Sequence, residues 1–382
     1  MENAITILDH LQFDGPTDEQ KKALLAMSDF VKDSNTEDFY ILCGSAGTGK
    51  TSITTALIGH LNSKAIFYSI AAPTGRAARV LGRKSKTVSN TIHSMIYNTK
   101  SNPETGEVVF TLKDNTVSDF CVYIIDEASM IASKAQKEES SLFISKNALL
   151  TDLIRFVKGG NSRNKIIFLG DKNQLPPIYE LDSMALCSEF LEAKFQLKGC
   201  AYLLTEVKRQ EDGSNILKSA TKIRQAIDDN IGEVKLQGFE KVATVGQAAA
   251  AYIKSYSDYG FENTISIGAT HKMNMMFNSV VRKKLFRWNA NSIEPNELLI
   301  ITTTWKRNEY QLYSGDHVTV VSADYNDIEI VAGLHFLPVQ LRSKSINGTE
   351  ELIDDYILLE SISNPQGLDL HQENLLRFER FR

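Results

Sequence analysis

Continuous apolar runs alternate with helix-like segments through the first half of the chain. The runs are 39–43 (FYILC), 65–71 (AIFYSIA), 121–126 (CVYIID), 165–170 (KIIFLG) and 201–205 (AYLLT). Strands that are buried on both faces have this pattern, because helices cover both sides of a parallel sheet. The pattern therefore predicts an α/β fold built on a parallel sheet with helices on both faces.

This pattern breaks between residues 86 and 117, where the sequence becomes polar. Turn residues at 102–106 precede a short apolar run at 108–112 (VVFTL). We predict a hairpin, at about 86–118, inserted into the first domain.

A Gly-Ser-Asn sequence at 213–215 has the composition of a hinge followed by a helix cap. We therefore predict a first domain at 1–211 and a second, partial α/β domain at 212–304. The second domain repeats the strand-then-helix pattern, with a strand at 264–269 (TISIGA) and a helix at 272–286. Short β-like runs at 298–304 and 317–321 predict a small, barrel-like insertion at 305–382.

Composition changes this picture little. The 382 residues are 42% hydrophobic and 23% charged, which is typical of globular proteins and excludes a disordered chain. The net charge of −5 means that any nucleic acid must be bound by a local patch. Basic clusters at 76–86 and 282–287 are consistent with such a patch or with an ordinary solvated helix face.

The four cysteines are far apart in the sequence and form no C-x-x-C pair, so we interpret them as reduced core residues. The N-terminus lacks the features of a signal peptide, and no apolar run is long enough to span a bilayer. The prediction is a cytoplasmic protein with no membrane partner, and we expect it to be a monomer.

The segment Gly44–Thr51 matches the phosphate-binding pattern G-x-x-x-x-G-K-T directly between a strand and a helix. Its glycines let backbone N–H groups surround phosphates at a helix N-terminus. Lys50 places a positive charge at the β and γ phosphates of ATP, and the Thr51 hydroxyl is a magnesium ligand. The remaining nucleotide-binding residues are Gly44, Ala46, Gly47, Thr48 and Gly49.

Two acidic residues, Asp126 and Glu127, lie at the end of the predicted strand 121–126. A P-loop site needs a carboxylate there, so we expect Asp126 to hold magnesium and Glu127 to deprotonate the attacking water. The alternative is a pair of residues that cap a helix N-terminus.

The loop after the strand 165–170 contains Gln174, which can donate to the γ phosphate or orient the water. At the predicted domain boundary, Arg209 can neutralise charge in the transition state and couple hydrolysis to closure of the domains. A structural ion pair is the competing interpretation of Arg209.

Taken in order, these segments resemble superfamily 1 DNA helicases of the RecD-like branch, with most likeness to the phage-type Dda helicases. The matching segments are DEQK at 18–21, GSAGTGKT at 44–51, AAPTGRAARVL at 71–81, TIHS at 91–94, IIDEASM at 124–130, GDKNQLPP at 170–177 and LTEVKRQ at 204–210. The resemblance implies a P-loop NTPase with RecA-like domains that uses ATP and magnesium. It also implies that Gln20 contacts the adenine.

The same resemblance implies movement along single-stranded DNA from 5′ to 3′. Carried over residue by residue, it places DNA contacts at Thr74, His93, Thr270, Lys272 and Asn278, and an aromatic contact with a base at Phe110 of the hairpin. For Phe110 the alternative is packing within its own domain, and for His93 it is a histidine of the core. Proteins of replication or recombination are possible partners, and the sequence does not decide between them.

The resemblance covers about residues 14 to 340 and weakens steadily after Thr304. The family's last motifs, including a second catalytic arginine, do not occur before Arg382. We expect a fragment or an incompletely represented chain, and the alternative is a truncated or shortened family member that acts as an ATP-dependent DNA-binding switch and does not unwind DNA. A packaging or transport ATPase would share the P-loop and the acidic pair but would not explain GDKNQLPP.

Overall fold

A computed structural model describes the following residues of the chain: 6–101, 108–135, 143–144, 147–207, 215–236, 238–286, 292–302, 305–307, 310–344, 350–363, 368, 372 and 375–376. The chain forms two compact units, of which the first comprises residues 1–102 and 107–237 and the second 103–106 and 238–382.

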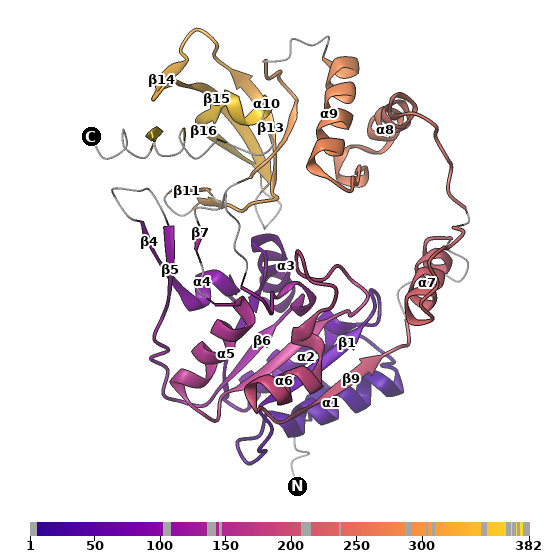
Figure 1. Ribbon diagram of the computed structural model, residues 1–382, viewed down its shortest axis with the longest axis vertical. Coiled ribbons are helices and arrows are strands. Elements are labelled where there is room, and N and C mark those ends of the chain that lie inside the picture. Colours follow the sequence, from indigo (N-terminus) through magenta and orange to yellow (C-terminus); the bar gives the residue numbers. More distant parts are fainter. Residues whose placement is uncertain are drawn as a thin grey trace. The chain divides into compact units, whose positions relative to one another are not determined.

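A six-stranded parallel sheet is the centre of the first unit (Figure 1). Its strands lie in the order β3-β2-β6-β8-β1-β9, and their bounds are β1 Phe39–Gly44, β2 Phe67–Ala72, β3 Ser89–Thr91, β6 Cys121–Ile125, β8 Lys165–Gly170 and β9 Gly199–Leu204. All five predicted runs coincide with a strand of this sheet. The predicted α/β fold is therefore confirmed.

Successive side chains of the strands enter two different cores. Phe39, Ile41 and Cys43 point into one core, while Tyr40 and Leu42 point into the other. The first core is covered by α4 (Ile92–Ile96), α5 (Leu149–Gly160), η3 (Met184–Leu186) and α6 (Ser188–Phe195). The second is covered by η1 (Ile7–His10), α1 (Asp18–Phe30), α2 (Lys50–Ser63) and α3 (Gly75–Ser85).

The predicted hairpin is present but shorter than expected. β4 (Tyr97–Ser101) pairs antiparallel with β5 (Val108–Leu112), and β7 (Phe143–Ile144) extends this small sheet. The residues from 86 to 96 do not belong to the hairpin, because β3 joins the main sheet and α4 packs on it. The hydrophobic Ile92 and Ile96 are fully buried there, and this burial outweighs the polar character of the surrounding sequence.

The helix α7 (Asn215–Asp228) follows a segment, 208–214, that is outside the described residues. The sequence placed the domain change before this helix, at 211/212. In the structure α7 is grouped with the first unit, and the change falls between residues 237 and 238.

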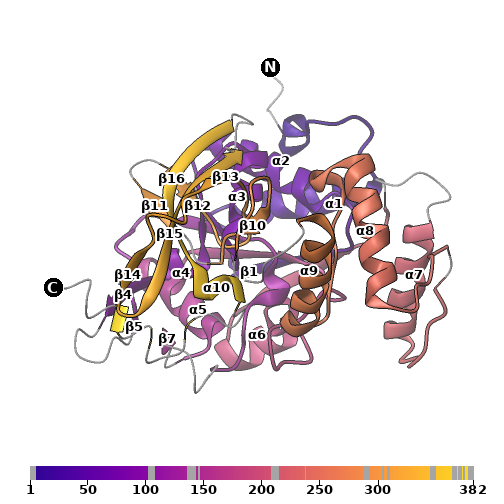
Figure 2. The same ribbon diagram turned by 90° about the horizontal axis from the view of Figure 1, so that it is seen from above.

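The second unit combines helices with an antiparallel sheet. The helices α8 (Val245–Tyr259) and α9 (His271–Leu285) lie side by side, with Tyr252 and Phe277 in edge-to-face contact at 5.5 Å between ring centroids (Figures 1 and 2). The remaining elements are η4 Phe261–Asn263, β10 Leu298–Ile300, β11 Trp305–Arg307, β12 Tyr310–Leu312, β13 His317–Ala323, β14 Glu329–Val331, β15 Leu334–Lys344, β16 Glu350–Leu358 and α10 Leu359–Ser363.

The predicted strand at 264–269 is wrong. No strand occurs between residues 264 and 270, where Ile265 is 73% exposed and Ile267 is 89% exposed. A strand needs hydrogen-bonded neighbours, and the described part of the second unit offers no parallel sheet to receive this segment. The next helix and the β-rich tail lie close to where the sequence predicts them, although β10 is shorter than the predicted run from 298 to 304.

Two of the four cysteines fit the prediction of core residues. Cys43 and Cys121 are buried, whereas Cys187 and Cys200 are half-buried, and all four are free thiols. Within the described ranges, no helix combines the length and apolarity that a membrane crossing requires.

An ion pair joins α9 to the β-rich part of the second unit. The guanidinium of Arg282 donates through Nε and Nη2 to the carboxylate of Glu297, which is 4% exposed, and also donates through Nη2 to the Ser292 carbonyl at 2.6 Å. The basic cluster at 282–287 is therefore not entirely a solvated helix face, because Arg282 forms this ion pair.

Replacing Arg282 with Met should lower the free energy of unfolding of the second unit by about 3 kcal/mol, because it leaves the buried Glu297 carboxylate without its partner. Both tryptophans of the sequence, Trp288 and Trp305, belong to this unit, so urea unfolding followed by tryptophan fluorescence reports on it alone. The exposed Lys254→Ala on α8 is the control, and equal midpoints for the two variants would contradict the prediction.

Candidate functional site

The predicted phosphate-binding loop lies between β1 and α2. Gly47 and Gly49 have φ of +89° and +92°, in the left-handed region that glycine adopts without strain. Thr48 closes the loop, because its hydroxyl donates to the Ser45 carbonyl at 2.9 Å. A Cβ atom added to Gly44 would lie 2.6 Å from the Thr48 hydroxyl, so the first position of the motif also needs glycine.

Lys50 is the first residue of α2 and folds back over this loop. Its ammonium donates to the carbonyl of Gly44 and, at 3.1 Å, to that of Ser45. Burial lowers the pKa of Lys50, while the carboxylates of Asp171, Glu127 and Asp126 oppose this shift. Three acidic side chains, which come from two neighbouring strand ends, thus act electrostatically on the lysine.

Strand pairing explains why these side chains meet. β1 pairs in parallel with β8, and β8 pairs in parallel with β6, so the carboxyl ends of the three strands share one edge of the sheet. The P-loop follows β1, Asp126 follows β6 and Asp171 follows β8. Asp171 was missed in the sequence, although its position directly after a buried strand was a signal that could have identified it.

The acidic pair after β6 is held by the backbone. The Asp126 amide donates to the Ala71 carbonyl on β2 at 2.9 Å, and the Asp126 carboxylate accepts from the Glu127 amide at 2.9 Å. Glu127 has φ of +52°, a left-handed conformation that costs a non-glycine residue energy and occurs often at functional sites.

The two carboxyls are electrostatically unfavourable as a charged pair. Burial raises the pKa of both, and the charge of Asp126 raises the pKa of Glu127 further. Lys50 acts in the opposite direction on both groups. A carboxyl whose pKa is raised binds protons more readily than an exposed one, which suits a group that has to accept a proton from water.

The residues also fit a magnesium ion. Magnesium takes oxygen ligands and is usually held by one or two carboxylates together with waters and substrate phosphates. Asp126 and Thr51 offer a carboxylate and a hydroxyl of this type. Among the described residues no group of three or more His, Cys, Asp or Glu side chains could hold a metal, so a complete shell would have to include oxygens from the nucleotide and from water.

Gln20 lies in the first turn of α1 and is 2% exposed. Its amide oxygen accepts from the Thr17 amide at 3.0 Å, which forms a capping box, and its amide nitrogen donates to the Thr48 carbonyl at 2.9 Å. The Gln20 side chain, which comes from a helix that covers the second core, therefore holds the P-loop through the Thr48 carbonyl. The predicted contact with adenine stays a prediction.

Gln174 is exposed in the loop after β8, and its backbone amide donates to the Asp171 carbonyl at 3.1 Å. Glu180 anchors the far end of this loop, because its carboxylate accepts from the Ser133 amide at 2.8 Å, the Ser133 hydroxyl at 2.5 Å and the Lys134 amide at 3.1 Å. The predicted Arg209 lies outside the described residues, since the description stops at residue 207 and resumes at 215.

Two of the predicted DNA contacts in the first unit have defined structural partners. Thr74 caps α3, where its hydroxyl accepts from the Ala77 amide at 3.2 Å, and it is exposed. His93 is exposed on one side and packs against Tyr97 and Phe110 at 5.7 and 5.8 Å between ring centroids.

Phe110 packs within its own unit, which is one of the two interpretations that the sequence left open. Its ring lies 5.3 Å from that of Tyr97 and contacts the core beside α4. Tyr97 is itself fixed by a hydrogen bond from its hydroxyl to the buried Asp152 carboxylate at 2.8 Å. No local pattern predicts this hydrogen bond, because Tyr97 and Asp152 are far apart along the chain.

In the second unit, the predicted DNA contacts gather on α9. Thr270 caps this helix, and its hydroxyl accepts from the Met273 amide at 3.2 Å. Lys272 and Asn278 are both exposed, so neither side chain is needed for the core.

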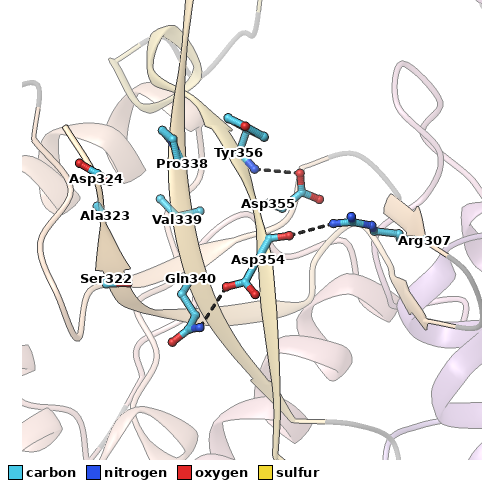
Figure 3. Close-up of a pocket in the computed structure, with 10 residues that line it drawn as sticks. All are labelled: Arg307, Ser322, Ala323, Asp324, Pro338, Val339, Gln340, Asp354, Asp355 and Tyr356. Atoms are coloured by element: carbon cyan, nitrogen blue, oxygen red, sulfur yellow. Dashed lines mark hydrogen bonds between the residues drawn. The ribbon is translucent and has the colours of Figure 1, made fainter. Parts of the chain in front are cut away.

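A separate hollow of about 630 Å³ lies on the β-rich sheet of the second unit (Figure 3). Arg307 and Gln340 both point toward Asp354, the first donating to its carbonyl at 3.0 Å and the second to its carboxylate at 3.0 Å. None of the residues predicted as functional lines this hollow.

Comparison with known proteins yields related sequences. A family model described as AAA domain matches residues 28–180, which include the P-loop, the acidic pair and Gln174. The "ATP-dependent DNA helicase dda" of Enterobacteria phage T4 is 27% identical over 340 residues, which cover 84% of this chain and 71% of that protein.

Two further proteins show weaker likeness. The "ATP-dependent RecD2 DNA helicase" of Deinococcus radiodurans is 27% identical over 180 residues, covering 47% of this chain and 21% of that protein. Among solved structures, the Pif1 helicase from Candida albicans aligns with 96% of this chain and 93% of its own, at 16% identity and a TM-score of 0.40.

Replacing Glu127 with Gln should raise the melting temperature of the protein at neutral pH, because it removes a carboxylate that burial and Asp126 disfavour. A carboxyl with a raised pKa stabilises the fold below its ordinary pKa of 4.5, and this contribution is lost as the pH rises through the raised value. The advantage of the variant should therefore be absent in acid and appear as the pH rises.

Thermal unfolding between about pH 4 and pH 8 measures this dependence. Glu192→Gln, at an exposed position of α6, is the matched control and should show no such gain. A Glu127→Gln protein that melts below its parent at neutral pH would rule out the electrostatic explanation.

Proposed function

We propose that this chain, a superfamily 1 helicase related to the Dda and RecD types, hydrolyses ATP with magnesium and uses the energy to move along single-stranded DNA from 5′ to 3′. The observation that carries the proposal is the convergence of Lys50 with three carboxylates at the carboxyl ends of neighbouring strands. The names of both sequence relatives are those of ATP-dependent DNA helicases.

Each residue of the nucleotide site has a role that its chemistry supports. The P-loop from Gly44 to Thr51 binds the phosphates, and on release from the loop carbonyls the Lys50 ammonium can stabilise charge on the γ phosphate. Glu127 accepts the proton of the attacking water, which its raised pKa favours. Thr51 and Asp126 hold magnesium, which neutralises phosphate charge when it is bound.

Two residues complete the proposed reaction. Gln174, exposed beside Asp171, orients the water or donates to the γ phosphate. Arg209 neutralises negative charge that develops in the transition state. Gln20 contacts the base of the nucleotide through the same helix turn that braces the P-loop.

The DNA is proposed to bind through exposed polar and basic side chains, without recognition of base sequence. Thr74 and His93 contribute from the first unit, and Thr270, Lys272 and Asn278 contribute from the second, while Phe110 supplies an aromatic surface for a base. Phosphate contacts and stacking suffice for such binding. The overall charge of −5 is compatible with it, because a local cationic patch is enough.

Steady-state ATP hydrolysis, measured with and without a short single strand of DNA, tests the proposed reaction. DNA should stimulate hydrolysis by the parent protein, and Lys50→Ala should lower kcat by about 100-fold or more, because it removes a charge from the phosphate site. Lys64→Ala, at the exposed C-terminal end of the same helix, should leave the rate unchanged. Nucleotide binding without DNA-stimulated turnover would contradict the proposed motor activity.

The salt dependence of DNA binding tests the contribution of α9. Lys272→Ala should weaken binding to single strands of every sequence alike and reduce the slope of log K against log salt by about 0.7, the value for one lost phosphate contact. Lys254→Ala on α8 changes the net charge equally and should leave the slope unaltered. Equal slopes for the two variants would remove Lys272 from the proposed DNA site.

A further inference from the structure

One buried carboxylate joins the two loops that carry Glu127 and Gln174. Glu180 ends the Gln174 loop and is 9% exposed. Its carboxylate accepts from the Ser133 amide at 2.8 Å, the Ser133 hydroxyl at 2.5 Å and the Lys134 amide at 3.1 Å. Hydrogen bonds to a carboxylate are stronger than those between neutral groups, and burial strengthens them further, so this contact is an anchor between the two loops.

The loop between Asp171 and Glu180 has little freedom of its own. At its start, the Gln174 amide donates to the Asp171 carbonyl at 3.1 Å. Pro176 and Pro177 follow, and their rings fix the backbone angle φ at both positions. A displacement of Glu180 would therefore be transmitted to Gln174 through a short and stiff stretch of chain.

The turn directly before Glu180 depends on an anchor. Tyr179 has φ of +65°, a left-handed conformation that costs a residue other than glycine energy. Tyr179 is also 85% exposed, so packing of its side chain does not impose this conformation. The Glu180 amide donates to the Pro177 carbonyl at 3.0 Å, which closes the turn. The contacts of the Glu180 carboxylate hold this turn in place.

The segment that Glu180 contacts is fixed within the first unit. Most of residues 128–133 are buried, and the Ala132 carbonyl accepts from the Leu150 amide of α5 at 3.0 Å. This segment begins directly after Glu127. Glu180 therefore ties its own loop to a rigid part of the chain that also carries the proposed general base.

We propose that Glu180 is a positioning residue that holds Gln174 at the γ-phosphate end of the nucleotide site and thereby lets the protein distinguish ATP from ADP. This inference rests on the proposed nucleotide site, in which Gln174 orients the water or donates to the γ phosphate. Glu180 acts through the position of Gln174 and has no contact of its own with the nucleotide. The anchor depends on acceptor atoms at the right place and not on the charge of the side chain.

Glu180→Met and Glu180→Gln in the full chain separate the anchor from the charge. Methionine is of similar length but lacks the carboxylate oxygens, so it leaves the Ser133 and Lys134 amides without their acceptor. Glutamine keeps the contact, because its amide oxygen can accept from both backbone N–H groups while its NH2 group donates to the Ser133 hydroxyl. The methionine variant should therefore be defective, and the glutamine variant should resemble the parent.

The Kd values of ADP and of a non-hydrolysable ATP analogue are the first measurement, since their ratio reports the contribution of the γ phosphate. Glu180→Met should lower the ratio of the ADP value to the analogue value about tenfold, as should Gln174→Ala, because each loses about one hydrogen bond to a charged group. Glu180→Gln should stay within about twofold of the parent. Glu192→Met, at an exposed position of α6, is the matched control.

ATP hydrolysis in the presence of single-stranded DNA is the second measurement. Glu180→Met should lower kcat about tenfold or more, as misplaced reacting groups do. In a chain that already carries Gln174→Ala, it should cause little additional loss, because residues that act as a unit are not additive. Ser133→Ala removes only one hydrogen bond of the anchor and should change both quantities in the same direction by a smaller factor. This variant takes the place of Glu180→Met if the latter does not fold.

The outcomes separate the two proposals. A purely structural Glu180 would lower the melting temperature and leave the ratio of Kd values unchanged, which would overturn the inference. A Glu180→Gln protein as defective as Glu180→Met, or full additivity with Gln174→Ala, would overturn it as well. In each of these cases a parent protein with DNA-stimulated hydrolysis leaves the proposed function standing. If the parent shows no such hydrolysis, the proposed function fails, while the ratios of Kd values still decide the inference.

Discussion

Parallel pairing of β1 between β8 and β9 is the constraint on which the rest of the site depends. The register sets Cys43 beside Gly170 and Gly44 beside Leu204, so the chain leaves three adjacent strands at one level of the sheet. Loops that follow parallel strands must begin at this edge. The P-loop, Asp171 and the exit from β9 are neighbours for this reason and not because of any local sequence preference.

Lys50, Asp126 and Glu127 lie at this same edge of the sheet, and each of these charges would be costly to bury alone. Lys50 is withdrawn from water, which lowers its pKa, while Asp126 and Glu127 are withdrawn from water, which raises theirs. Lys50 and the carboxylates partly offset one another's cost, whereas the charge of Asp126 adds to the cost of charging Glu127, and burial has the largest effect on all three pKa values. Sites for chemistry commonly hold groups in such unfavourable states, and the strand cores that surround them provide the stability. Here β1, β6 and β8, the three strands that end at this site, are buried along their whole lengths.

Much of the first unit was predictable because its signals are local. Continuous apolar runs identified five of the six strands of the sheet, and the glycines and lysine of 44–51 identified the P-loop. The strand β3, Ser89–Thr91, was not predicted, because a three-residue edge strand of Ser, Asn and Thr has no apolar pattern. The acidic pair was predictable from its place after a strand, but the left-handed conformation of Glu127 was not, since glycine is the residue that usually signals it.

What the sequence could not supply are contacts between residues that are distant along the chain. The contacts of Glu19 with Thr205 and of Glu180 with Ser133 both join segments whose proximity exists only once the sheet has formed. The segment 264–269 shows the same limit in the opposite case, in which the local pattern is present but the strand does not form. Its alternation of apolar and polar residues is that of a strand, yet a strand forms only where a neighbour accepts its hydrogen bonds, and Ile265 and Ile267 remain exposed without one. A local pattern thus specifies which conformation a segment favours, whereas the surrounding sheet decides whether that conformation is realised.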